Sequence, residues 1–346
     1  MTRKAIIGSI RAGLLSGAFF LAAAAIPLVG TVVTFFTPAP ILIFAAGRTR
    51  ATLRSAVTIA LATVMVGLGA GAAVVVHHLA LHGAATASTL ATLQHAAGFA
   101  MIPAGVYLMT FGVLTAVMAW MIERQRPFEL IIVTAGGVTL TVLAVVALVA
   151  AGGPAALVKM MQTFLAAQLA QGQEFYRMLG MQSAVQPETQ SEVADVVRLS
   201  PALVAMLIGL SALLNLRVFW RWVGKKRLPY PLFGDLARWS TPEWLIWGLI
   251  ATGFGMLAPI APLSDIAKNA FLCFAVIYFC QGLAIIGFYF QALAVPTIFR
   301  AVIYFVTIVH PVVSAVVCLA GVFDMWIDFR RLKPPRQEAG NYGDFL

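Results

Sequence analysis

Charged residues are scarce in this chain. Only 10% of its 346 residues are Asp, Glu, Lys or Arg, whereas 61% are hydrophobic. A soluble domain carries about a quarter charged residues, so this composition excludes an ordinary soluble globular protein. It predicts an all-α, polytopic integral membrane helix bundle whose outer surface contacts lipid.

Cysteine is almost absent as well. The three cysteines, Cys273, Cys280 and Cys318, all fall inside strongly apolar segments. Thiols in such segments behave as small apolar residues, so we expect no disulfides and no role beyond packing.

The N-terminus resembles a secretory signal peptide, with a basic start, an apolar run and three alanines at residues 22–24. However, the apolar run continues past Pro27 and Gly30 to Ala46, and no polar mature domain follows. We therefore expect an uncleaved first span.

Long apolar runs, in contrast, are abundant. A helix needs about 20 apolar residues to cross the hydrocarbon layer. Nine runs approach this length: residues 12–29, 31–47, 56–76, 97–121, 129–151, 199–219, 243–260, 269–293 and 299–323. Pro38 and Pro40 should shorten or break the second run, and Pro311 predicts a broken or re-entrant ninth. We expect about 8–9 transmembrane helices.

The positive charges indicate an orientation. The net charge is +10, and the basic residues cluster in short stretches between apolar runs. This distribution is typical of cytoplasmic loops in the bacterial inner (cytoplasmic) membrane, with the lipid bilayer and not nucleic acid as the partner. Alternation of the first six spans places the N-terminus and the 220–242 loop in the cytoplasm. The basic tail sequence FRRLKPPR favours the same side, whereas nine full crossings would place it outside.

One long polar insertion, residues 153–198, interrupts the pattern outside the cytoplasm. Its first part repeats apolar residues at steps of three and four, which predicts an amphipathic helix. Residues 183–197 are expected to form a turn, with Ser191 as a helix cap. The predicted organisation is a six-span bundle (1–220), a basic loop (221–242), C-terminal membrane segments (243–330) and a polar tail (331–346).

Two pairs of glycines lie four residues apart, Gly13/Gly17 and Gly67/Gly71. Such spacing lets two membrane helices approach closely. The sequence GLGAG at 67–71 also resembles a nucleotide loop, but no GK[ST] follows it, so we interpret it as a packing element.

Five polar residues lie inside apolar runs: Asn215, Asn269, Gln281, Gln291 and His310. An amide or imidazole in hydrocarbon requires a hydrogen-bond partner, so these side chains should face the bundle. They are candidates for ligand binding or helix packing, with packing favoured for the amides. His310 is either a functional group or a neutral histidine beside a proline kink.

The sequence contains no arrangement typical of an enzyme. His77, His78 and His82 are weak candidates for a shared metal, because His78 and His82 are one helical turn apart, but no acid lies between His77 and Met121. No Ser/His/Asp set or carboxylate pair falls within the spans. We expect a protein without a catalytic site, metal or cofactor.

The segment GVFDMWIDFRR, residues 321–331, follows the last apolar run. Asp324 and Asp328 are four residues apart and would share a helix face, Arg330 can offset their repulsion, and Trp326 suits the headgroup region. We interpret these residues as an interfacial helix end or as a docking surface for a partner.

The C-terminal third resembles a known family. Asn269 opens a span, Gln281-Gly282-Leu283-Ala284-Ile285 lies at its centre, and Gly321 to Asp324 and Asp328 to Arg330 follow the last run. This arrangement is similar to the YybS-like bacterial membrane proteins, domain-of-unknown-function family 2232. The resemblance implies no catalytic residues, because the activity of that family is not established.

The first six spans more weakly resemble two other groups, the S components of energy-coupling-factor transporters and the rod-shape protein MreD. The shared pattern is a six-helix bundle with a short second span. S components dock their transmembrane partner through an Ala-x-x-x-Ala face, and Ala18/Ala22 matches that spacing.

These observations favour a non-enzymatic, small-molecule-binding transport subunit that resembles an S component. The alternative is a membrane scaffold for envelope or cytoplasmic proteins. A third hypothesis is an intramembrane enzyme that uses His310 or the group of His77, His78 and His82. A binder predicts a pocket among the first six spans near the outer leaflet, whereas a scaffold predicts a solid bundle.

Overall fold

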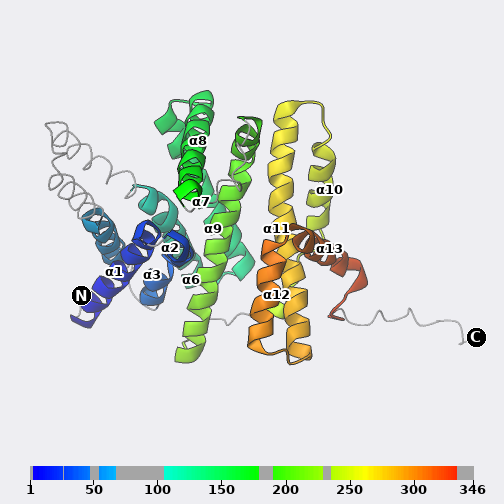
Figure 1. Ribbon diagram of the computed structural model, residues 1–346. Helices are drawn as coiled ribbons and strands as arrows, with labels where there is room; N and C mark the ends of the chain where they lie inside the picture. The colour runs from blue at the N-terminus through cyan, green and yellow to red at the C-terminus, as the bar shows by residue number, and fades with distance from the viewer. Residues whose placement is uncertain are drawn as a thin grey trace, which may run out of the picture. The chain divides into compact units, whose positions relative to one another are not determined.

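The computed structural model describes residues 3–25, 27–46, 54–67, 105–178, 190–228 and 235–332 (Figure 1). Every regular element within these ranges is a helix, which confirms the all-α prediction. The chain divides into two compact units, Met1–Leu232 and Phe233–Leu346. We call them unit 1 and unit 2 and describe each by itself.

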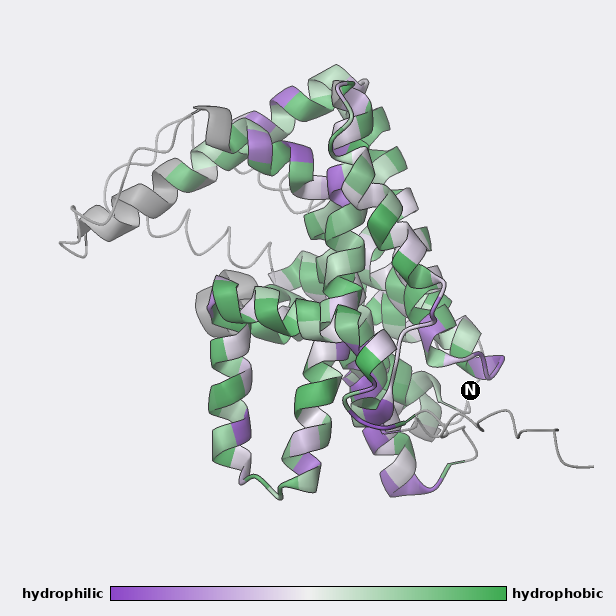
Figure 2. Cartoon of the chain, turned by 90° about the vertical axis from the view of Figure 1, so that its right-hand side faces the viewer, coloured by the Kyte–Doolittle hydropathy of each residue, from purple (hydrophilic) through white to green (hydrophobic). Residues whose placement is uncertain are grey.

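Five helices in the described ranges are long and apolar enough to cross a membrane. They are Ala5–Ala22, Gly105–Glu123, Phe128–Ala151, Val193–Lys226 and Pro262–Ala292, and a bent pair, Thr297–Val309 with Pro311–Ile327, raises the number to six. The described parts of the three remaining expected runs form the shorter apolar segments Val32–Ala45, Arg54–Gly67 and Leu245–Gly255. The described residues therefore contain five or six candidate spans, fewer than the 8–9 expected. Most residues of the described helices are hydrophobic, as their green colour in Figure 2 shows.

Unit 1 begins with α1 (Arg3–Ala25), α2 (Pro27–Thr34) and α3 (Ala39–Ala45). The helix Arg54–Gly67 packs against α1 through the predicted glycine pair. A Cβ atom on Gly13 would lie 2.6 Å from the carbonyl oxygen of Ala56, and one on Gly17 would lie 2.7 Å from Cβ of Thr63. The close-packing prediction is confirmed for this pair, while Gly71 lies outside the described residues.

The rest of unit 1 contains a π-helical turn, η1 (Leu108–Gly112), and the helices α6 (Val113–Glu123), α7 (Phe128–Ala151), α8 (Pro154–Met178) and α9 (Gln190–Lys226). The helix α8 lies where an amphipathic helix was predicted and contacts α7 and α9. The predicted turn over 183–197 is wrong from residue 190 onward, because α9 begins at Gln190 and Ser191 is in its first turn.

Unit 2 contains the short η3 (Leu236–Arg238), then α10 (Leu245–Gly255), α11 (Ala261–Ala292), α12 (Thr297–Val309) and α13 (Pro311–Ile327). The long α11 packs against α10 and against α13. The predicted break at Pro311 is confirmed, because α12 and α13 meet at an angle of 99°.

Candidate functional site

A non-helical turn at residues 35–38 separates α2 from α3 in unit 1. Pro38 has no N–H to continue the helix, and its ring would clash with the carbonyl group of Thr34. The hydroxyl group of Thr37 donates to that carbonyl oxygen at 2.6 Å. A local hydroxyl group therefore binds the carbonyl oxygen that the proline cannot reach.

Two side chains of α9 hold the same turn from a distant part of the sequence. The Ser211 hydroxyl group and the Asn215 Nδ2 atom both donate to the carbonyl oxygen of Phe35, at 2.9 and 2.7 Å. Asn215 Nδ2 also donates to the carbonyl oxygen of Ser211 at 2.6 Å. These two carbonyl groups fix the orientation of the amide. Its Oδ1 atom is buried and accepts no hydrogen bond within the described residues.

A third contact comes from α1 and from the segment that precedes η1. The Ser16 hydroxyl group lies 2.8 Å from both the carbonyl oxygen of Thr37 and the hydroxyl group of Tyr107. Tyr107 is buried, and its ring meets that of Phe20 edge-on at a centroid distance of 5.3 Å. The π-helical turn η1 starts at the next residue. Such turns are frequent at functional sites.

A cavity of about 290 Å³ lies where these interruptions meet. Thr34 and Phe35 line it from the end of α2 and the turn, and Thr110 and Phe111 line it from η1. The remaining lining residues come from α6, α7 and α9: Leu114, Leu143, Val204, Leu207, Ile208 and Ser211. The wall is apolar with three hydroxyl-bearing side chains, which suits a small molecule that is largely apolar. We call this space the central cavity.

Unit 2 contains a different kind of polar group, a buried ion pair. Asp324 Oδ2 accepts from Arg330 Nη2 at 2.6 Å and from Gln281 Nε2 at 3.1 Å, and all three residues are buried. The oxygen of the same Gln281 amide accepts from the hydroxyl group and from the backbone N–H of Thr241. The backbone N–H of Phe329 donates to Asp324 Oδ1 at 3.0 Å. We call Thr241, Gln281, Asp324 and Arg330 the polar lock.

The arginine of the polar lock also fixes the segment around η3. Its Nη1 atom donates to the carbonyl oxygens of Ala237 and Trp239, both at 2.8 Å. Its Nε atom is buried without a hydrogen bond in the described part of the chain. Asp324 and Arg330 therefore join α11, α13 and the η3 segment, so this part of the predicted interfacial group forms internal contacts.

Two glycines bring α11 and α13 into backbone contact beside the polar lock. A Cβ atom on Gly282 would lie 2.1 Å from the carbonyl oxygen of Val317, and one on Gly321 would lie 2.0 Å from that of Tyr278. No larger residue fits unless a helix moves. The residues that carry the family resemblance, Gln281-Gly282 and Gly321 to Asp324, thus meet at one point.

The other candidates do not join either group. Asn269 Nδ2 donates to the carbonyl oxygen of Asp265 on its own helix, and the exposed Gln291 donates to Asp235 Oδ1 at 3.2 Å. Trp326 is 62% exposed. Asp328 ends α13 in a left-handed conformation, and its Oδ1 atom accepts from the backbone N–H of Leu332.

His310 is the one histidine within the described ranges. His310 is exposed at the bend between α12 and α13, and no group of three potential metal ligands occurs in the described ranges. His77, His78 and His82 lie outside those ranges.

Sequence reasoning missed the hydroxyl groups that bind the backbone around the 35–38 turn. Ser16, Thr34, Thr37 and Ser211 are common residues in membrane helices, and no spacing distinguishes them. The available signal was Pro38, because a proline in a short apolar run releases backbone groups that hydroxyl side chains then bind.

The helices and buried polar groups define a polytopic helical membrane protein. The family model described as predicted membrane protein, DUF2232, matches residues 79–325. The chain therefore belongs to this family, as the C-terminal motifs indicated. No curated protein and no solved structure matches the chain. The match contains the polar lock except Arg330, whereas α1 to α3 precede it.

Proposed function

We propose that this protein binds a small, largely apolar molecule in the central cavity and serves as the non-enzymatic, solute-binding subunit of a membrane transport system. The observation that carries this proposal is the meeting of two helix irregularities, the 35–38 turn and η1, at one cavity of about 290 Å³. Interrupted helices are the usual source of binding groups inside membranes, because they release backbone polar groups at depth.

The hydrogen bonds around the turn support a prearranged site. Ser16, Ser211 and Asn215 reach it from α1 and α9, so the wall of the cavity does not depend on local bonds alone. Ser211 lines the cavity, and Asn215, with its unused Oδ1 atom, lies one turn farther along α9. A ligand with an apolar body fits the lining of the central cavity.

Filling the central cavity with a larger side chain tests the proposal. Leu207 lines the cavity, whereas Leu203, one turn earlier on α9, does not, and both side chains are exposed. We expect Leu207→Trp to remove a co-purifying small molecule that wild type and Leu203→Trp both retain. The measurement is mass spectrometry of molecules released by denaturing the detergent-purified proteins. Equal release from all three would contradict the proposal.

The alternative function is a scaffold for envelope or cytoplasmic proteins. The polar lock favours it, because its groups bind one another and join three elements of unit 2. Under this alternative, Leu207→Trp leaves the small-molecule inventory unchanged, and a specific protein co-purifies with wild type in mild detergent.

A further inference from the structure

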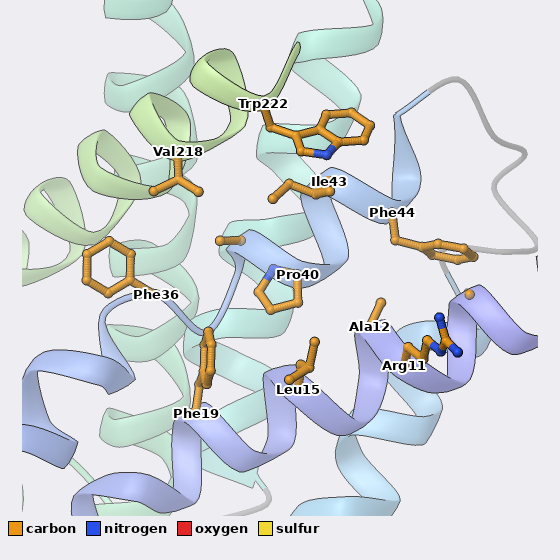
Figure 3. Close-up of a pocket in the computed structure, with 12 residues that line it drawn as sticks. Arg11, Ala12, Leu15, Phe19, Phe36, Pro40, Ile43, Phe44, Val218 and Trp222 are labelled. Atoms are coloured by element: carbon orange, nitrogen blue, oxygen red, sulfur yellow. The ribbon is translucent and has the colours of Figure 1, made fainter. Parts of the chain in front are cut away.

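A second, larger hollow of about 510 Å³ lies in unit 1, between α1, α3 and α9. Figure 3 shows Arg11, Ala12 and Leu15 on α1 opposite Val218 and Trp222 on α9, with α3 between them. Every lining side chain except Arg11 is hydrophobic, and Gly8 completes the wall, where a Cβ atom would lie 2.4 Å from the Phe44 ring. We call this space the lateral groove; it shares no lining residue with the central cavity.

The charge in the lateral groove has one sign. Arg11 is exposed, and within the described ranges its guanidinium group forms no ion pair. No acidic residue lines the groove. On α9, Lys225 and Lys226 follow Trp222 by three and four residues, so they extend the same face by one turn, and both are exposed. The groove therefore combines an apolar trough with a cation that has no ion-pair partner among the described residues, next to a basic helix end.

This combination matches an anionic amphiphile. An acyl chain would fill the apolar part of the groove. An acidic headgroup would pair with Arg11 and with the two lysines at the end of α9. Basic pockets between membrane helices bind acidic phospholipid headgroups for this reason. We propose that the lateral groove is a site for an anionic phospholipid, with one acyl chain against α1, α3 and α9 and the phosphate group at Arg11.

The charge of the site is tested by comparing two lipids with the same acyl chains. We expect phosphatidylglycerol to bind the detergent-purified full-length chain more tightly than phosphatidylcholine, as measured by native mass spectrometry. Arg11→Gln should weaken phosphatidylglycerol binding about five-fold, whereas Arg11→Lys should retain most of it. The matched control is Arg126→Gln, because Arg126 is exposed in the same unit and does not line the groove. Equal loss in Arg11→Gln and Arg126→Gln would overturn the proposal in favour of diffuse attraction.

The apolar part of the site needs its own variant. Leu15 lines the groove and is 51% exposed, and its neighbour Leu14 is 47% exposed but does not line it. We expect Leu15→Trp to reduce phosphatidylglycerol binding while Leu14→Trp does not. Glycerol phosphate, which has no acyl chain, should not compete. If glycerol phosphate competes, or if Leu15→Trp changes only the oligomeric mass, the groove holds a free phosphate compound or a second copy and the proposal fails.

Discussion

Units 1 and 2 use their buried polar residues in opposite ways. In unit 2 the polar lock pairs side chains with one another, so that Asp324 accepts from both Gln281 and Arg330. In unit 1 the side chains of Ser211 and Asn215 donate to one backbone carbonyl group of a non-helical turn, and the central cavity lies beside it. The first arrangement stabilises a contact between helices, whereas the second keeps a turn in place beside open space.

The contrast separates a structural role from a binding role. A buried ion pair with nearly all of its hydrogen bonds made internally has little left to offer a ligand. A turn whose carbonyl groups are bound from outside can keep its shape while a neighbouring cavity fills and empties. We therefore assign the proposed binding function to unit 1, although the short motifs that carry the family resemblance lie in unit 2.

Loss of the buried cation should cause the largest effect. Arg330→Ala leaves the Asp324 carboxylate buried without its charge partner and should lower the free energy of unfolding by about 3–5 kcal/mol. The measurement is unfolding of the purified protein in detergent. Lys268→Ala is the control, because Lys268 pairs with Asp265 at 3.6 Å on a partly exposed surface and should cost at most about 1 kcal/mol.

A paired substitution sharpens this test. Replacing both Asp324 and Arg330 with apolar residues removes both charges together, so Asp324→Leu with Arg330→Met should recover much of the stability that Arg330→Ala loses. Recovery would confirm that the pair acts as a structural contact. Equal stability of Arg330→Ala and Lys268→Ala would show that the polar lock is not buried as described.

The sequence predicted the helix class and both proline interruptions but only part of the sites. Pro38 and Pro311 break their helices for reasons that are local, namely the missing N–H and the ring. The partner of a buried amide is not local, since Asn215 binds Phe35, 180 residues away. The sequence predicted Asp324 at the membrane interface, because its four-residue spacing from Asp328 and the nearby arginines indicate a helix end. Its burial depends instead on how α11 packs against α13, which no local pattern shows.

The amide of unit 1 should give an intermediate effect. Asn215→Leu has a similar size but leaves two donated hydrogen bonds unmade, so the free energy of unfolding should fall by about 1–3 kcal/mol. The same variant should weaken retention of a molecule in the central cavity, because the 35–38 turn loses one of its two contacts from α9. Gln291→Leu is the matched control, since Gln291 is an exposed amide and should change stability by no more than about 0.5 kcal/mol. Equal losses in the two variants would show that the contacts of Asn215 with the 35–38 turn add no stability.

His310 should give the smallest effect. The bend between α12 and α13 has local causes: Pro311 cannot donate a backbone hydrogen bond, and the Ser314 hydroxyl group donates to the carbonyl oxygen of Thr307 at 2.5 Å. The His310 side chain is exposed and makes no hydrogen bond in the described part of unit 2. We expect His310→Ala to change the free energy of unfolding by less than about 0.5 kcal/mol, whereas Ser314→Ala should cost about 1 kcal/mol. If His310→Ala instead lowers the free energy of unfolding more than Ser314→Ala does, the imidazole has a partner in the membrane. The bend at Pro311, like the 35–38 turn, would then be held by distant contacts.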